Sequence, residues 1–304
     1  MGLIVVGSIA LDYIETPFDK VEDALGGSTT YIALAASYFA APVEIIGVVG
    51  DDFSDKHIKL FEKNNIGTEG LQVISGGKTF RYGCKYRYDL NVRDTLYTEL
   101  NVFEKFNPVI PEKMRKSSFV LLGNIAPQLQ TNVLDQMDNA RFIVCDTMNF
   151  WIEGWKEDLL EVLKRVNVLI INDSEARLLA QEANLIKAAK IISEMGPAYL
   201  IIKKGEHGAL LFGEDTIFSA PAYPLENIYD PTGAGDAFAG GFTGYLYKTN
   251  DLSFENMKRA VIYGSTMASF CVEKFSTRGL EDLSTLQIHD RFIEFKELSA
   301  FEEK

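Results

Sequence analysis

Residues 230–242 combine a tight turn with an acidic residue at the start of a predicted helix. Pro231 fixes φ and interrupts the preceding structure, while Gly233 and Gly235 permit backbone conformations that a Cβ would forbid. Small and apolar residues return at helical spacing beyond Asp236. Because the first turn of a helix has free N–H groups and a partial positive charge, this turn is suited to binding an anion, above all a phosphate.

Asp236 has two interpretations at this position. A carboxylate in the first turn of a helix can simply interact favourably with the helix dipole. Beside a bound phosphate the same carboxylate adds a second negative charge, which is useful if it accepts a proton from an attacking hydroxyl group. The second interpretation predicts a phosphoryl-transfer site with Asp236 as the general base.

The composition limits the classes of protein that fit. The 304 residues suffice for one large α/β domain or two ordinary ones, and the 47% apolar share can form a substantial core. The net charge of −13 disfavours a nucleic-acid partner, which usually requires a basic face. No apolar run approaches the roughly 18 residues that a membrane span requires, so we expect no membrane partner. Three widely spaced cysteines indicate buried thiols and a reducing cytoplasm.

Short apolar runs alternate with helical patterns along most of the chain. Unbroken apolar runs are typical of strands buried on both faces of a parallel sheet. We expect such strands at Leu3–Val6, Glu44–Val49, Phe119–Leu122, Phe142–Cys145, Val168–Ile171 and Leu200–Ile202. We expect helices at Thr29–Phe39, Asp55–Lys63, Val133–Met137, Lys156–Val166, Glu175–Gln181, Leu185–Met195, Phe254–Val272 and roughly Gln287–Leu298. The alternation predicts a parallel sheet with helices on both faces.

Two stretches, at about residues 12–24 and 78–103, break this alternation. In the second stretch, aromatic and apolar residues from Phe80 to Tyr88 alternate with charged ones, which is typical of antiparallel strands with one buried face. We interpret both stretches as one small sheet beside the main domain. Its aromatic stripe would have to be buried against another surface, for which a second copy of the chain is a candidate.

The sequence Asp-Pro-Thr-Gly-Ala-Gly-Asp at residues 230–236, followed by Ala-Phe-Ala-Gly-Gly-Phe, resembles the C-terminal signature of the PfkB (ribokinase-like) family of carbohydrate and nucleoside kinases. The resemblance implies one ribokinase-like α/β domain over residues 1–304, a three-layer sandwich with a mainly parallel central sheet. It also implies a small antiparallel β lid, built discontinuously from about 12–24 and 78–103, that often makes a homodimer contact. The alternative is an antiparallel extension that only supports the core.

For catalysis, the resemblance implies that Asp236 is the general base. The backbone amides of Gly233, Ala234 and Gly235 would stabilise the charge on the moving phosphoryl group. Asp230 and the backbone near it are a candidate site for a monovalent cation such as K⁺, as in several family members.

The resemblance implies that the substrate is bound by Asp12, Gly26, Gly27 and Asn124. Asp12 follows the first predicted strand, where a carboxylate can accept hydrogen bonds from two adjacent hydroxyls of a polyol or ribose; the alternative is a turn residue. The two glycines let the backbone approach a ligand. Asn124 either contacts the substrate or forms an Asx turn before a proline.

Two positions depart from the family's sugar-binding pattern. Ala10 stands where many sugar kinases of the family have Asn, and Tyr31 stands where an Asn is common. The ring of Tyr31 either stacks on a flat ligand or packs in the core. Asp146 and Asn149, after another predicted strand, also face the substrate edge without a defined role. The identity of the substrate therefore stays open.

On the nucleotide side, the resemblance implies an ATP site formed by Asn172, Thr232, Lys203, Gly205, Gly208 and Gly264. Lys203, where the family often has Thr, either contacts a phosphate or ends a strand in solvent. Gly264 would leave room for a flat ring. Glu175 would organise Mg²⁺ through water, because Mg²⁺ retains several waters and prefers oxygen ligands. A sufficient structural alternative is that Ser174 or Asp173 is the N-cap of the following helix and Glu175 an acid in its first turn.

We therefore expect a cytoplasmic, ATP- and Mg²⁺-dependent kinase that transfers the γ-phosphate to a hydroxyl of a sugar or nucleoside. One alternative is a non-catalytic nucleotide or sugar sensor with the kinase fold, against which Asp236, Asn172 and Glu175 argue. Another is a dinucleotide-dependent oxidoreductase, but the first predicted strand is not followed by Gly-x-Gly-x-x-Gly. A Walker A loop is also absent from the sequence.

Overall fold

The computed structural model describes residues 2–300 and contains a nine-stranded sheet with the order β13-β12-β11-β10-β9-β8-β1-β4-β5. The strands are β1 (Leu3–Val6), β4 (Val43–Gly50), β5 (Ile66–Ile74), β8 (Phe119–Leu122), β9 (Phe142–Asp146), β10 (Val168–Asn172), β11 (Tyr199–Lys203), β12 (Ala209–Gly213) and β13 (Thr216–Ala220). Neighbouring strands are parallel except in the pairs β11–β12 and β12–β13. The prediction of a mainly parallel sheet is confirmed.

The strands near the middle of this sheet are the ones that the sequence predicted. Every residue of β1 and β8 is apolar and buried, because both faces of the sheet are covered. The strands that sequence reasoning missed are β5 and β13, at the two edges, and β12, next to β13; about three quarters of their residues are not buried. Edge strands carry polar residues and glycines, so they lack the unbroken apolar run on which the prediction depended.

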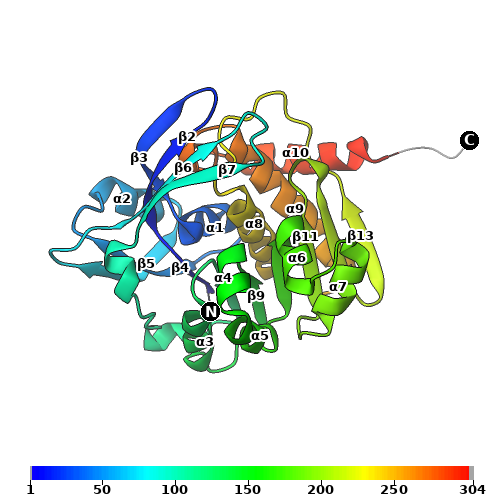
Figure 1. Ribbon diagram of the computed structural model, residues 1–304, viewed down its shortest axis with the longest axis horizontal. Helices are drawn as coiled ribbons and strands as arrows, with labels where there is room; N and C mark the ends of the chain where they lie inside the picture. The colour runs from blue at the N-terminus through cyan, green and yellow to red at the C-terminus, as the bar shows by residue number, and fades with distance from the viewer. Residues whose placement is uncertain (1, 301–304) are drawn as a thin grey trace, which may run out of the picture.

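Helices cover both faces of the large sheet, which makes the predicted three-layer sandwich (Figure 1). They are α1 (Ser28–Ser37), α2 (Asp55–Lys63), α3 (Pro127–Asp135), α4 (Asn149–Gly154), α5 (Lys156–Leu163), α6 (Asp173–Ala180), α7 (Leu185–Ser193), α8 (Ala234–Thr249), α9 (Phe254–Val272) and α10 (Thr285–Leu298). One core joins the sheet to α1, α8 and α9, and the other joins it to α3, α5, α6 and α7. Helix α3 begins earlier than predicted, because Pro127 is favourable at a first helical position.

A second sheet has the order β3-β2-β6-β7 and lies beside α1 at the upper left of Figure 1. Its strands are β2 (Ala10–Glu15), β3 (Lys20–Gly26), β6 (Phe80–Tyr86) and β7 (Arg93–Glu99). We call these four strands the small sheet. The pairs β2–β3 and β6–β7 are antiparallel, but β2 and β6 are parallel, so the expectation of an antiparallel sheet is wrong in this respect. Two hairpins far apart in the sequence meet along β2 and β6, and no short turn imposes an antiparallel direction there.

The small sheet is unevenly buried, with four of the six residues of β2 buried. Cys84 and Tyr86 of β6 pack with Ile14 in a minor core, whereas Tyr88, at the end of the expected aromatic stripe, is 84% exposed. Every residue of β7 is exposed. The small sheet therefore depends on the main domain for its position.

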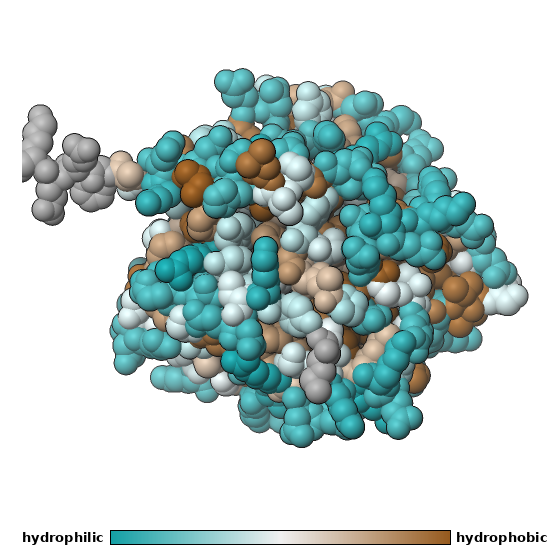
Figure 2. All heavy atoms as spheres, turned by 180° about the vertical axis from the view of Figure 1, so that it is seen from behind, coloured by the Kyte–Doolittle hydropathy of each residue, from teal (hydrophilic) through white to brown (hydrophobic). Residues whose placement is uncertain are grey.

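The face of the molecule that lies behind the view of Figure 1 is mostly polar, with apolar residues scattered in separate spots (Figure 2). Cys84, Cys145 and Cys271 are buried and unpaired, as expected for free thiols. Within residues 2–300, no helix is both long and apolar enough to cross a membrane.

Candidate active site

The turn before α8 adopts the conformation that its glycines permit. Gly233 precedes the helix with φ 77°, which residues with a Cβ rarely adopt. A Cβ on Gly233 would collide with the ring of Tyr31, which is only 1% exposed below the turn. Of the two interpretations of Tyr31, the structure therefore matches core packing: the ring supports the turn instead of offering a face to a ligand.

Hydrogen bonds hold this turn from two sides. The Asp230 carboxylate accepts hydrogen bonds from the amides of Thr232 and Ser276, both at 2.8 Å. Burial raises the pKa of Asp230, and these donors act against that shift by favouring the charged form. From the small sheet, the Tyr86 hydroxyl lies 3.1 Å from Thr232 Oγ1. The turn is thus connected both to the core and to the small sheet.

The backbone amides of the turn differ in whether they already donate a hydrogen bond within the protein. The Ala234 amide donates to the carbonyl of Pro231 at 3.2 Å, and the Ala237 amide donates to the carbonyl of Gly233 at 2.7 Å. Gly235 faces the side chain of Lys203 instead: a Cβ on Gly235 would lie 2.7 Å from Lys203 Nζ. A lysine beside the first turn of the helix adds positive charge where an anion would bind.

Asp236 lies in the first turn of α8, enclosed by protein on most sides and still partly open to solvent. Burial raises the pKa of its carboxyl to about 7, the charge of Asp146 acts in the same direction, and Lys203 and Arg93 act against the shift. A carboxyl that titrates near neutral pH can take a proton from a reacting hydroxyl group. The environment of Asp236 is therefore suited to a general base.

Lys203, the last residue of β11, points toward this site and not into solvent. Its Nζ lies 3.7 Å from Asp146 Oδ1, and the side chain is 17% exposed. Burial alone would lower the pKa of Lys203, but Asp146, Glu175 and Asp236 outweigh it and raise the pKa. Of the two interpretations of Lys203, the solvated strand end does not apply, because this side chain is a charged cation inside the site.

Asn172 and Glu175 form a reciprocal cap at the start of α6. The Asn172 amide donates to Glu175 Oε2 at 2.8 Å, and the Glu175 amide donates to Asn172 Oδ1 at 2.8 Å. The N-cap is thus Asn172 and not Ser174 or Asp173 as the structural alternative predicted, and the cap fixes the direction of the Glu175 side chain. Burial raises the pKa of Glu175 to about 7, and Lys203 acts against the shift.

The acidic groups fit Mg²⁺ bound through water better than a direct protein cage. Among residues 2–300, no group of three or more His, Cys, Asp or Glu side chains could hold a metal directly. Glu175 lies within electrostatic range of Asp146, whose buried Oδ1 has no hydrogen-bond partner. Mg²⁺ keeps several waters and is often bound by one or two carboxylates together with substrate phosphates. Glu175 and Asp146 offer such oxygen atoms.

On the substrate side, Asp12 is a buried acid on β2 with a free acceptor. It is 4% exposed, and its Oδ1 has no hydrogen-bond partner. Burial raises the pKa of Asp12 to about 8; Asp230 acts in the same direction, whereas Arg93 and the amide of Gly27 favour the charged form. A Cβ on Gly26 would collide with this carboxylate. An unsatisfied buried acceptor beside a bare backbone is a suitable place for ligand hydroxyls.

Asn124 lies after β8, but its polar atoms are already used by protein partners. Its Nδ2 donates to Met148 Sδ at 3.1 Å, and its Oδ1 accepts from Trp151 Nε1 at 2.8 Å. Asn124 therefore holds Trp151 of α4, a helix that begins at Asn149 and was not predicted. A substrate contact by Asn124 would have to replace one of these hydrogen bonds.

The glycines expected at the nucleotide lie in two places. Gly205 begins a short 3₁₀ helix, η3 (Gly205–His207), directly after β11, and Gly208 follows it with φ 82°. Both therefore lie at the edge that carries Lys203. Gly264 is buried in α9, where a Cβ would lie 2.8 Å from the carbonyl oxygen of Phe238, so the packing of α8 on α9 is a sufficient reason for this glycine.

Sequence reasoning missed Arg93, on β7, as a site residue. Burial raises the pKa of the Asp12, Glu175 and Asp236 carboxyls, and the positive charge of Arg93 acts against the shift in all three. Arg93 belongs to a strand whose residues are all exposed, so neither periodicity nor composition distinguishes it from a surface arginine.

One edge of the α/β sheet presents a carboxyl of raised pKa, a lysine and a glycine turn at a helix start, and together these groups indicate the class of protein. These groups suit a phosphotransferase that acts on an alcohol group, because phosphoryl transfer requires mainly positioning and electrostatic stabilisation. The chain belongs to the pfkB family of carbohydrate kinases, whose pattern matches residues 3–283.

Individual relatives agree with this class. The chain is 29% identical over 247 residues to a cytidine kinase of Thermococcus kodakarensis, covering 80% of this chain and 87% of the relative. The nucleoside kinase of Methanocaldococcus jannaschii, an archaeal member of the ribokinase family, superposes with a TM-score of 0.79 at 20% identity, over 97% of this chain and 99% of that one.

A putative ribokinase II from E. coli, solved in complex with ATP and Mg²⁺, superposes with a TM-score of 0.78 at 18% identity, over 96% of this chain and 99% of that one. The fold is thus ribokinase-like, as predicted. The protein is a phosphotransferase that acts on an alcohol group of a sugar or nucleoside.

Proposed function

We propose that this protein is a nucleoside kinase that uses ATP as the phosphoryl donor. The observation that carries the proposal is the placement of Asp236, a partly exposed carboxyl whose pKa is raised to about 7, beside Lys203 and the turn at Gly233. The cytidine and nucleoside kinases among its relatives favour a nucleoside over a free sugar as the acceptor.

In the proposed mechanism, the free acceptor of Asp12 binds hydroxyls of the ribose, and the backbone at Gly26 and Gly27 lies against the ligand. Asp236 removes the proton from the reacting hydroxyl as its oxygen attacks the γ-phosphorus. The new P–O bond forms while the bond to the β-phosphate oxygen breaks, and ADP leaves with that electron pair. Lys203 and the turn stabilise the charge on the phosphoryl oxygens.

The nucleotide would lie along Asn172, Thr232, Lys203, Gly205, Gly208 and Gly264. The amides of Gly233, Ala234 and Gly235 would face its terminal phosphate, with the Ala234 amide exchanging its bond to Pro231 for one to the phosphate. Mg²⁺, when bound with the nucleotide, supplies charge neutralisation to the phosphates, and Glu175 would hold it through water.

The small sheet is proposed as the lid of a single kinase domain over residues 1–304, with lid segments at about 12–24 and 78–103. Closure of such a lid excludes water that would otherwise compete for the phosphoryl group. The apolar side chains of Leu96 and Tyr97 on the exposed strand β7 support the prediction of a homodimer through the lid, which sedimentation analysis can test.

Two further expectations remain predictions. A cytoplasmic location agrees with the three unpaired cysteines, and fractionation of cells would check it. A K⁺ requirement would depend on the buried Asp230 and the backbone near it, and replacing K⁺ with a large organic cation in the assay would check it.

The proposed function is tested by measuring ADP release with ATP and Mg²⁺ over a panel of cytidine, uridine, adenosine, inosine, ribose and fructose. We expect turnover with nucleosides above that with either free sugar, and a phosphorylated nucleoside as the product by mass spectrometry. Turnover with sugars alone would reject the nucleoside assignment. ADP release that is independent of every acceptor would reject the proposed role of Asp12.

A further inference from the structure

Arg93 is a cation that the small sheet brings to the reacting centre. It is the first residue of β7 and is paired in register with Tyr86 of β6, whose hydroxyl contacts Thr232 of the glycine turn. The Arg93 guanidinium carbon lies 5.6 Å from the centre of the Tyr82 ring, which flanks it on the same sheet. Although Arg93 is open to solvent, protein surrounds it on most sides. This is the environment of a residue that lines a ligand site.

The hairpin that carries Arg93 reaches from the substrate side to the nucleotide side. Asp12 lies two strands away on β2, while the tip of the hairpin places Asn91 Oδ1 3.4 Å from the position that a Cβ on Gly205 would occupy. In Figure 1 this cyan hairpin extends toward the part of the molecule that holds α9 and α10. Arg93 therefore lies between the groups proposed for the acceptor and the turn proposed for the nucleotide.

The charges of the site leave a role for this arginine. Asp12, Asp146, Glu175 and Asp236 are four acids around the space that a triphosphate would enter, and Lys203 is shared among three of them. Lys203 interacts with Asp146 at 3.7 Å and is attached to the rigid strand β11. Arg93 also acts on Glu175 and Asp236, but it acts on Asp12 in place of Asp146, and it comes from β7 of the small sheet.

We propose that Arg93 binds the γ-phosphoryl group of the donor during transfer, so that the small sheet supplies one of the positive charges on which the reaction depends. This inference rests on the proposed function. As the acceptor oxygen attacks and the bond to the β-phosphate oxygen breaks, negative charge shifts over the phosphoryl oxygens and toward ADP. A guanidinium can donate two parallel hydrogen bonds to such oxygens, which a lysine cannot do. Closure of the sheet would thereby complete the site.

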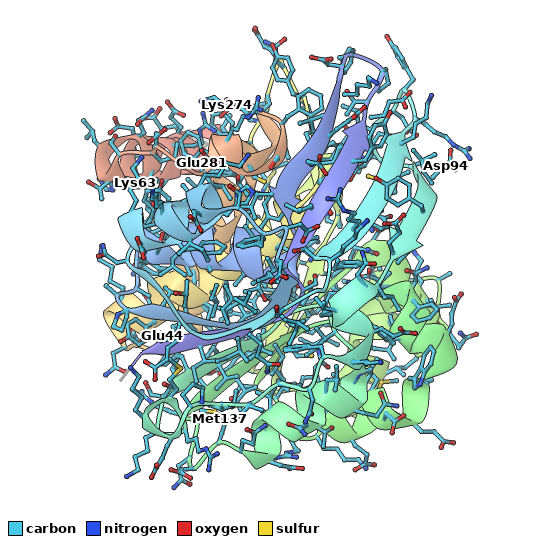
Figure 3. The ribbon with its side chains drawn as sticks, turned by 90° about the vertical axis from the view of Figure 1, so that its left-hand side faces the viewer. Glu44, Lys63, Asp94, Met137, Lys274 and Glu281 are labelled. Carbon is cyan, nitrogen blue, oxygen red and sulfur yellow. The ribbon has the colours of Figure 1, made fainter. Side chains whose placement is uncertain are left out.

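The test compares Arg93→Gln with the matched variant Arg87→Gln. Arg87 lies on the same hairpin but binds Asp94 at 2.8 and 3.1 Å, and Figure 3 shows Asp94 at the outer edge of the sheet. With saturating cytidine, calorimetry measures the affinity for a non-hydrolysable ATP analogue and for ADP. We expect Arg93→Gln to weaken the affinity for the ATP analogue by about tenfold or more and to leave the affinity for ADP unchanged. Arg87→Gln is expected to change neither.

Turnover provides the second readout. Arg93→Gln should lower kcat by about 10²–10³-fold, the usual effect of removing one preorganised donor to a transition-state oxyanion. Arg93→Lys, which keeps the charge and loses the second hydrogen bond, should retain an intermediate rate. Because Arg93 lies on the edge strand of the small sheet and outside its minor core, we expect both variants to fold with the melting temperature of the wild type.

Three results would overturn the proposal: an unchanged kcat in Arg93→Gln, an equal loss of affinity for ADP and the ATP analogue, or a raised KM for cytidine with kcat unchanged. The last result would assign Arg93 to the acceptor. If wild-type protein phosphorylates no nucleoside, the proposed function fails, whereas the comparison of the analogue with ADP still decides whether Arg93 binds a terminal phosphate.

Discussion

The start of α8 and the hairpin of β6 and β7 contribute groups to the proposed reacting centre in opposite ways. The turn before α8 is supported by the buried Tyr31, is hydrogen-bonded to Asp230, and leads into a helix whose residues 237–244 are buried. The hairpin is held by its neighbours, with β7 exposed along its whole length. This division suits the proposed mechanism, in which the rigid part holds the base Asp236 and the proposed lid holds Arg93.

The most severe test of the rigid part is Asp236→Asn, which keeps the shape of the side chain and removes the proton acceptor. We expect kcat to fall by about 10²–10⁴-fold with little change in ATP affinity, the usual contribution of a general base. Asp55→Asn is the matched control, because Asp55 occupies the first turn of α2, away from the site. Full activity of Asp236→Asn in a coupled ADP assay would remove the general base from the mechanism.

The contribution of the turn itself is tested by Gly233→Ala. The added Cβ meets the Tyr31 ring and a φ of 77°, so we expect kcat to fall by about 10²-fold through misplacement of the anion site. Unfolding in denaturant should show a loss of about 1–3 kcal/mol. Gly76→Ala is the control that adds backbone strain without a steric collision, because Gly76 has φ 74° and no atom within 4 Å of its added Cβ. Equal effects of the two variants on kcat would argue against the role of Tyr31 as a support.

The pH dependence of kcat/KM reports on the same base. Burial raises the pKa of Asp236 to about 7, and the reaction needs the deprotonated form, so activity should be present above pH 7 and lost below it. The expected slope is about tenfold per pH unit. Since the charge of Arg93 opposes the raised pKa, Arg93→Gln should move this acid limb to higher pH. A profile that stays flat to pH 5 would contradict the assignment of Asp236.

The smallest effect is expected at the contact between the two regions. Tyr86→Phe removes the hydroxyl that lies 3.1 Å from Thr232 Oγ1. We expect the binding free energy of the nucleoside to weaken by about 0.5–1.5 kcal/mol, seen as a raised KM for the nucleoside. Tyr82→Phe is the control, since the Tyr82 hydroxyl contacts Thr95 within the small sheet at 2.9 Å. A rise in KM of the same size in both variants would indicate a general weakening of the sheet.

The buried strands and the turn at 230–236 could be predicted from the sequence because each carries its signal locally. An apolar run such as Phe119–Leu122 reports burial on both faces, and the glycines of the turn report their own backbone conformation. The edge strand β5 and the strand β12, next to the other edge, could not be predicted in this way. Their half-exposed faces mix polar and apolar residues, and only pairing with a neighbouring strand makes them strands.

Site residues show the same limit. Lys203 was singled out by its place at a strand end, but its direction depends on Asp146, which is 57 positions away in the sequence, and on the open space at Gly235. Asn124 was expected either to contact the substrate or to form an Asx turn, but its side chain binds Trp151, which belongs to a helix without a strong periodic pattern. Arg93 carries no local signal at all. Contacts between distant segments decide these three roles, and no short window of sequence contains them.

Asp12 is part of β2, and β2 belongs to the small sheet instead of to the nine-stranded one. Asp12, the acid proposed to bind the acceptor, therefore belongs to the proposed lid and not to the nine-stranded sheet. An outward movement of this lid would also move the Asp12 carboxylate away from the acceptor. In the proposed mechanism, opening of the lid would therefore release the phosphorylated product and expose the catalytic centre in one movement.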